Sequence, residues 1–144
     1  MTKKSKNDIE AEKLKLEYAL DHGIDFENRT IRVTGAIGGG SGGLFGGDDE
    51  YFDFNLCDFA LSEMEKRSHD PITLKINSPG GECYDATAII GRMKVSPCQI
   101  ITESYGHCMS AATLIFMAGD VRRISEYCTP MFHKISYGIR GNRS

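Results

Sequence analysis

Several features are missing from this sequence of 144 residues, and each absence narrows the class of protein. There is no tryptophan, there are only four prolines, and no apolar run is long enough to cross a bilayer. The longest apolar run, from Cys108 to Ala118, is too short for this and is interrupted by polar residues. The short basic start is followed by charged residues and not by the apolar segment of a secretory signal. We therefore expect no membrane segment and a cytoplasmic location.

The sequence also lacks a strong charge bias and a metal-binding cysteine pattern. A net charge of −3, with 40% hydrophobic and 26% charged residues, is ordinary for a globular protein and does not indicate nucleic-acid binding. The five cysteines are widely spaced, without a Cys-x-x-Cys pair or cysteine and histidine pairs at zinc spacing. We interpret them, Cys108 included, as reduced core thiols and expect no metal and no cofactor.

The hydrophobic pattern alternates between helical and strand periods along the chain. We expect helices at 8–21, 48–64, 84–93 and 109–117, and strands at 30–37, 72–76, 99–102, 121–125 and 130–135. This alternation predicts an α/β fold with a mainly parallel sheet, in a single domain over residues 1–144. Residues 38–47 contain seven glycines. Because no Gly-Lys-Ser/Thr follows them, we interpret them as a flexible connection and not as a phosphate loop.

Two strand-to-helix turns, at 77–81 and 106–112, are the most informative segments. Both come at the carboxyl ends of predicted strands, the edge at which open α/β sheets bind ligands. Ser110 in the second turn precedes an apolar helix, where a serine is most often an N-cap. The position also suits a nucleophile, because the N–H of Ala111 at the positive end of that helix could hold an oxyanion.

A nucleophilic serine also needs a base and a second oxyanion donor. Gly81 has no side chain, so its N–H could approach a substrate carbonyl closely. His133 lies in a predicted strand of mixed polarity, where a lone histidine is usually structural. His107 is close to Ser110 in sequence, and we interpret it as an orienting or exposed group and not as the base. Each of these residues is weak evidence for a catalytic site by itself, so the interpretation depends on the order and spacing of the segments.

The order and spacing of these segments resemble the proteolytic subunit of the Clp protease, the ClpP family. Residues 76–81 (Ile-Asn-Ser-Pro-Gly-Gly) are similar to the family's oxyanion turn, residues 106–112 (Gly-His-Cys-Met-Ser-Ala-Ala) to its nucleophile segment, and residues 130–133 (Pro-Met-Phe-His) to its histidine strand. Residues 28–35 are also similar to the opening strand of the family, so the resemblance runs from about residue 28 to residue 135. The oxyanion turn and the nucleophile segment together are specific for the family, whereas either motif alone would not be.

The resemblance implies a fold, an activity and a site. The fold would be the ClpP/crotonase-like βαβ spiral with a mainly parallel sheet, and the activity that of a serine endopeptidase. Ser110 would be the nucleophile and His133 the base, and the N–H groups of Gly81 and Ala111 would hold the oxyanion. The resemblance also implies homo-oligomeric rings, unfolded proteins or peptides as substrates, and a Clp-type ATPase unfoldase as partner.

The sequence departs from the family in several places. The family's third catalytic residue is an aspartate well downstream of the histidine, and no residue of this chain matches it, since Asp85 and Asp120 lie before His133. We expect a C-terminally truncated member: a fragment, one part of a split-gene product, or a degenerate inactive subunit. The glycine-rich insertion indicates a divergent branch, such as a phage version, and an ATPase-independent phage maturation protease is a further alternative. Lys134 is a poor partner for a Ser-Lys dyad, because adjacent strand residues point to opposite faces.

Overall fold

The structure, a computed structural model, describes residues 5–39 and 51–135, which form four helices and one sheet of seven strands. In chain order the elements are α1 (Lys6–Asp21), β1 (Ile24–Asp25), β2 (Thr30–Ile37), β3 (Tyr51–Phe52), α2 (Phe54–Arg67), β4 (Ile72–Gly81), α3 (Cys83–Lys94), β5 (Ile100–Met109), α4 (Ala111–Met117), β6 (Val121–Ile124) and β7 (Thr129–Met131). The sheet order is β1-β2-β4-β5-β6, with β3 paired to β2 and β7 paired to β5. Every one of these pairs is parallel except β1–β2, so the predicted mainly parallel α/β fold is confirmed.

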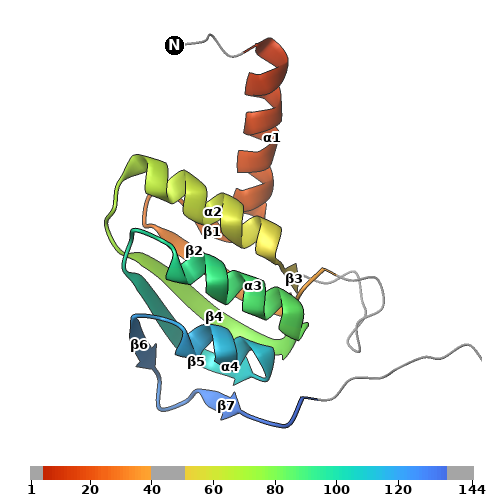
Figure 1. Cartoon of the computed structure of the whole chain (residues 1–144), viewed down its shortest axis with the longest axis vertical. Coiled ribbons are helices and arrows are strands. Elements are labelled where there is room, and N and C mark those ends of the chain that lie inside the picture. Colours follow the sequence, from red (N-terminus) through yellow and green to blue (C-terminus); the bar gives the residue numbers. More distant parts are fainter. Residues whose placement is uncertain (1–4, 40–50, 136–144) are drawn as a thin grey trace, which may run out of the picture.

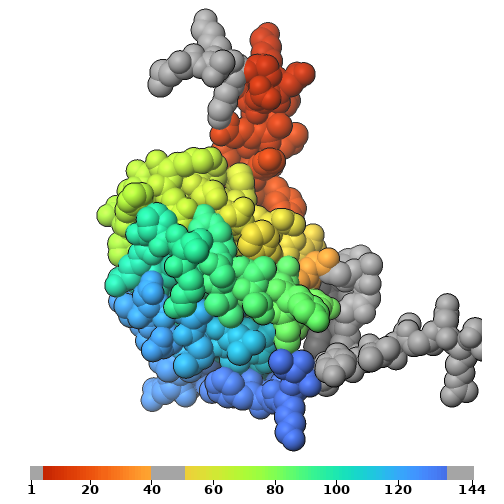
Figure 2. Space-filling view, in the orientation of Figure 1, coloured from red at the N-terminus to blue at the C-terminus, as the bar shows by residue number. Residues whose placement is uncertain are grey.

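Helices α2, α3 and α4 cover one face of the sheet (Figure 1). Successive strand residues point to opposite faces, and the alternate residues Ile72, Leu74 and Ile76 of β4 are buried. They belong to one apolar cluster with helix residues such as Leu61 and Ile89. Burial of this cluster is the main favourable contribution to folding. Helix α1 buries only Ala19, and it stands out from the body of the molecule (Figure 2).

Helix α1 begins and ends close to the predicted boundaries. Ser5 is its N-cap: the Ser5 Oγ accepts a hydrogen bond from the N–H of Asp8, and the Asp8 carboxylate accepts one from the N–H of Ser5. This reciprocal capping box satisfies two backbone donors. The helix is followed by Gly23, whose φ of +82° favours glycine. Among the described residues, no helix is long and apolar enough to cross a membrane.

The helix predicted over 48–64 begins later than expected. Helix α2 starts after Asp53, whose carboxylate caps it by accepting a hydrogen bond from the N–H of Leu56 at 2.8 Å. Phe52, which we predicted to be helical, lies instead in β3 and pairs with β2. Residues 40–50, which include most of the predicted glycine-rich connection, lie outside the described part of the chain.

Strand β4 continues beyond its predicted end at residue 76 through Gly81. Gly80 and Gly81 pair with β2 instead of forming a separate turn. The register shifts beside Gly35, whose φ is +69°, and such a bulge leaves some residues without a ladder partner. An irregular ladder accommodates Pro79, which has no N–H to donate.

Strand β5 is much longer than the predicted strand at 99–102, because its polar residues find partners within the sheet. The Ser104 Oγ donates a hydrogen bond to a backbone carbonyl of β4 at 3.0 Å, and Glu103 forms a 2.9 Å ion pair with Arg123 of β6. Polar residues in a row resemble a loop in the sequence, which explains the wrong boundary. The strand therefore runs up to Met109, and only Ser110 separates it from α4.

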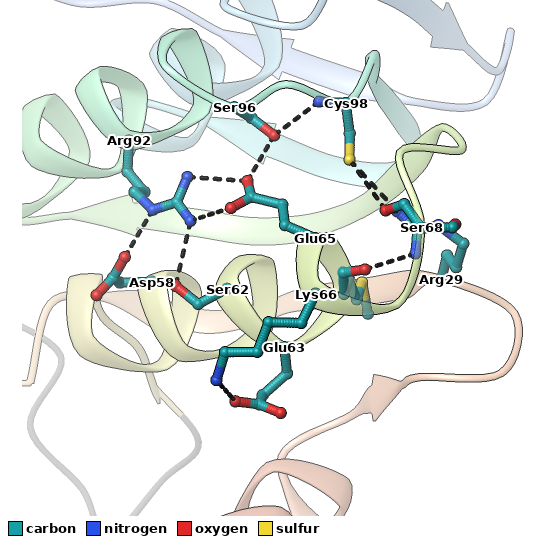
Figure 3. Close-up of polar contacts among 11 residues, drawn as sticks. Arg29, Asp58, Ser62, Glu63, Glu65, Lys66, Ser68, Arg92, Ser96 and Cys98 are labelled. Atoms are coloured by element: carbon teal, nitrogen blue, oxygen red, sulfur yellow. Dashed lines mark hydrogen bonds and ion pairs between the residues drawn. The ribbon is translucent and has the colours of Figure 1, made fainter. Parts of the chain in front are cut away.

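A cluster of ion pairs joins α2 to α3 (Figure 3). Arg92 donates a hydrogen bond to Asp58 at 2.6 Å and two hydrogen bonds to Glu65 at 3.0 and 2.7 Å. Partial burial by itself would raise the pKa of Glu65, but hydrogen bonds from Arg92 and Ser96 and the charge of Arg92 outweigh it and lower this pKa. The Arg92 and Glu65 side chains are 14% and 17% exposed, so water screens this bidentate pair less than a surface pair.

We expect Arg92→Ala to lower the free energy of unfolding by about 2 kcal/mol, because it leaves two carboxylates without their shared partner. Urea unfolding at neutral pH measures this change. Lys13→Ala is the control, because Lys13 pairs with Glu17 at the surface, with both side chains more than half exposed, and its loss should cost less than about 0.5 kcal/mol. Equal effects of the two substitutions would show that the cluster contributes no more than a surface pair.

The lowered pKa of Glu65 predicts a pH dependence of stability. Because this pKa is lower in the folded state, its contribution is fully present above the ordinary value of 4.5 and is lost as the pH falls through the folded-state value. We expect the stability difference between the wild type and Glu65→Gln to be largest at neutral pH and to shrink below about pH 4.5. Urea unfolding of both proteins across this range measures the difference. A constant difference would contradict the assignment.

Candidate active site

Ser110 occupies the single-residue junction between β5 and α4. Its φ of 52° and ψ of −125° lie in a region that residues with a Cβ rarely adopt. Its N–H donates a hydrogen bond to the carbonyl of Met131 at 2.8 Å. Its carbonyl accepts two hydrogen bonds, from the N–H of Thr113 at 3.0 Å and from the Thr113 Oγ1 at 2.5 Å. These three bonds hold the strained backbone in place.

The side chain of Ser110 contacts a histidine and does not cap the helix. Although Ser110 stands at the N-cap position of α4, its side chain makes no capping hydrogen bond. Its Oγ lies instead 2.7 Å from the Nε2 of His133. The simple N-cap interpretation is therefore wrong for this serine. The predicted nucleophile and the predicted base are within hydrogen-bond distance.

Strand β7 brings His133 to Ser110. It pairs in parallel with the last residues of β5, and Met131 opposes Met109 in this register. The strand predicted over 130–135 ends at Met131, so His133 follows the strand as an exposed side chain. A substrate can reach an exposed imidazole directly.

Gly80 of the neighbouring strand lies against Ser110, and Gly81 lies against Ile37 of β2. A Cβ on Gly80 would stand 2.6 Å from the carbonyl oxygen of Met109 and 2.7 Å from the Cβ of Ser110, and the φ of Gly80 is +95°. A Cβ on Gly81 would stand 2.2 Å from the carbonyl oxygen of Ile37. Only glycine fits either position, and the two predicted turns meet at one edge of the sheet as expected.

Two polar side chains that sequence reasoning did not single out hold this edge together. The buried Ser78 donates a hydrogen bond to the carbonyl of Gly35 at 2.6 Å and accepts one from the N–H of Gly80 at 3.1 Å. Asn77 accepts a hydrogen bond from the N–H of His107 at 2.9 Å and so links β4 to β5. Both residues lie inside the quoted motif, but only the packing reveals their partners.

No carboxylate among residues 5–39 and 51–135 hydrogen-bonds to His133. Asp120 accepts a hydrogen bond from the N–H of Ile100, at the far end of β5 from Ser110, at 2.8 Å. Asp85 accepts one from the N–H of Phe54 at 3.0 Å, and burial raises its pKa. Both carboxyl groups therefore bind backbone N–H groups and not His133.

The other reactive side chain near Ser110 is the thiol of Cys108. This residue is 1% exposed, and burial raises its pKa to about 11, so the thiol is neutral at physiological pH and a poor nucleophile. All five cysteines are free thiols, as predicted, but only Cys57, Cys98 and Cys108 are buried. Cys128 packs against the core while partly exposed, and the prediction of a core position is wrong for Cys83. Within the described part of the chain, no group of three His, Cys, Asp or Glu side chains is placed to hold a metal ion.

Comparison with known protein sequences finds Clp protease subunits among the relatives of this chain. The Clp protease family matches residues 57–144. The ATP-dependent Clp protease proteolytic subunit 3 of Rhodococcus jostii is 30% identical over 118 residues, which cover 81% of this chain and 53% of the relative. The ATP-dependent Clp protease proteolytic subunit 1 of Corynebacterium jeikeium is 34% identical over 98 residues, which cover 65% of this chain and 50% of the relative. The chain thus spans about half the length of the curated relatives that it matches.

Solved structures show the same fold. ClpP1 from Listeria monocytogenes matches with a TM-score of 0.62 and 24% identity, over 82% of this chain and 61% of its own. The ClpP protease catalytic domain from Plasmodium falciparum matches with a TM-score of 0.63 and 24% identity, over 93% of this chain and 63% of its own. These likenesses confirm the ClpP-type fold implied by the sequence motifs. Since the family match extends from α2 to residue 144 and the fold agrees with it, this chain belongs to the Clp protease family.

Proposed function

We propose that this chain acts as a serine endopeptidase of the ClpP type, which hydrolyses peptide bonds of unfolded proteins or peptides. The observation that carries the proposal is the 2.7 Å distance between the Ser110 Oγ and the His133 Nε2. A serine hydroxyl is a weak nucleophile unless a base takes its proton, and a neutral imidazole at this distance can do so. The Gly80 backbone lies directly against this serine, and Gly81 follows it at the end of β4, near the place where a substrate carbonyl would need donors.

In the first step His133 accepts the hydroxyl proton of Ser110 while the Oγ bonds to the carbonyl carbon of the substrate. The carbonyl π electrons move to the oxygen, which becomes an oxyanion. The N–H groups of Gly81 and Ala111 stabilise this charge. Ala111 is the first residue of α4, so its N–H is among those that lack a partner within the helix. The positive end of the helix dipole adds to the stabilisation.

In the second step the carbon–nitrogen bond breaks as the electrons of the oxyanion return to the carbonyl. His133 gives its proton to the departing amine, which leaves as the first product. A water molecule then loses a proton to His133 and attacks the acyl group, and the second product leaves as a carboxylic acid while Ser110 regains its proton. Both halves of the reaction use the same base, and nothing is oxidised or reduced.

The same proposal includes an assembly and a partner. The relatives are named as proteolytic subunits of an ATP-dependent Clp protease, and we propose that this chain likewise forms homo-oligomeric rings in the cytoplasm, with a Clp-type ATPase unfoldase that delivers substrates. Helix α1 supports the assembly, because it exposes large apolar side chains, Ile9 at 55%, Leu14 at 62% and Leu20 at 57%. Ile9 and Leu20 lie on one side of this projecting helix and Leu14 on another, so a partner that contacts the helix would cover some of this apolar surface.

Labelling with a fluorophosphonate probe tests the nucleophile. We expect the wild type to be labelled on Ser110, Ser110→Ala to lose the label, and His133→Ala to label roughly 10²–10⁴-fold more slowly because the base is absent. Ser125→Ala is the matched control, since its Oγ accepts a hydrogen bond from the N–H of Tyr127 in an exposed turn. Intact-mass spectrometry measures the label. An unlabelled wild type, or a label that persists in Ser110→Ala, would sink the proposal.

Replacing a glycine tests the close approach of β4 to Ser110. We expect Gly80→Ala to slow labelling by at least roughly 10²-fold, because the new Cβ would displace Ser110 and disturb the oxyanion donors. Gly91→Ala is the control, because a Cβ there meets nothing within 4 Å. It should label at the wild-type rate and raise the free energy of unfolding by about 0.5–1 kcal/mol. A wild-type rate for Gly80→Ala would contradict the described geometry.

A further inference from the structure

The peptide unit between Ser110 and Ala111 connects the nucleophile to a proposed oxyanion donor. Its carbonyl belongs to Ser110 and its N–H to Ala111, and the unit is planar and trans. In such a unit the carbonyl and the N–H point in opposite directions, so a contact that fixes the carbonyl also fixes the direction of the N–H. A side chain that forms a hydrogen bond with the Ser110 carbonyl therefore also fixes the direction of the Ala111 N–H.

Thr113 is the side chain that holds this carbonyl. Its Oγ1 donates to the Ser110 oxygen at 2.5 Å, alongside the bond from its own N–H at 3.0 Å. Thr113 is 2% exposed, so water does not compete for this contact. Hydrogen bonds on the carbonyl of a peptide also polarise its N–H and make it a stronger donor.

A hydrogen bond from a threonine to the carbonyl of the preceding turn is common in helices, and α3 contains one. The Thr87 Oγ1 donates to the carbonyl of Cys83 at 2.7 Å on the exposed face of that helix. The contact of Thr113 differs because its acceptor is the strained residue at the junction, with a φ of 52°. One backbone bond, from the N–H of Thr113, holds that carbonyl as in an ordinary first turn, and the hydroxyl adds a second bond that helps to keep the strained peptide in its orientation.

We propose that Thr113 is a positioning residue for the oxyanion site. Its hydroxyl donates a hydrogen bond to the Ser110 carbonyl and in this way orients and polarises the N–H of Ala111. This inference rests on the proposed function, because it assigns a role in the same site. Thr113 touches no reacting atom and acts only through the peptide unit. Preorganised donors of this kind stabilise the oxyanion without rearrangement during the reaction.

The rate of fluorophosphonate labelling tests the inference. Thr113→Val removes the hydroxyl at nearly constant shape and should label about tenfold more slowly, a smaller loss than the roughly 10²–10³-fold cost of deleting a donor. Thr113→Ser keeps the hydroxyl and should label within about twofold of the wild type. The matched control is Thr102→Val, since the buried Thr102 Oγ1 donates to the carbonyl of Phe116 at the other end of α4, at 2.8 Å. It should also label within about twofold.

Equal rates for Thr113→Val and the wild type would overturn the inference, and so would an equal slowing in Thr102→Val. The backbone amide resonance of Ala111 provides a measurement that does not need activity. We expect its proton chemical shift to move in Thr113→Val, to return in Thr113→Ser and to stay unchanged in Thr102→Val. An unlabelled wild type would refute the proposed function. The Ala111 resonance would then test the role of Thr113 separately, and a resonance that does not move in Thr113→Val would reject that role.

Discussion

The close approach of the Gly80 backbone to Ser110 is the contact on which the rest of this site depends. A side chain at residue 80 would overlap the carbonyl of Met109 and the Cβ of Ser110, at 2.6 and 2.7 Å. The contact exists because β4 and β5 are parallel neighbours whose carboxyl ends meet at one edge of the sheet. This meeting puts the Gly80 backbone beside the Cβ of Ser110 and close to the N–H of Ala111, a proposed oxyanion donor.

The strain at Ser110 is supported from both of its sides. Met131 of β7 accepts the bond from its N–H, and Thr113 of α4 holds its carbonyl. A disfavoured backbone conformation persists only where the surroundings determine it, and here a strand and a helix do so together. The same strand leads to His133, so the support of the serine and the delivery of the imidazole share one element. This sharing explains why a short, mostly exposed strand can matter for the site.

Stability and site geometry depend on different parts of the fold. The apolar face of the sheet and the Arg92 cluster hold α2 and α3 against each other and against β4. The site lies at the carboxyl ends of β4 and β5, where hydrogen bonds from Ser78 and to Asn77 set the last residues of the strands. A strained edge can be tolerated because the buried cluster supplies most of the favourable free energy.

The sequence by itself determined the elements with a clear period, such as α1, β2 and α3, and the order of motifs that indicated the Clp protease family. It also named Ser110 and His133, which the structure brings to 2.7 Å. Only the tertiary structure decided the length of β5, the start of α2 after Asp53 and the strained conformation of Ser110. The partners of Ser78 and Thr113 likewise became visible only in the structure. These features depend on single hydrogen bonds between particular backbone and side-chain groups, several of them far apart in the chain, and such bonds leave no periodic signal in the sequence.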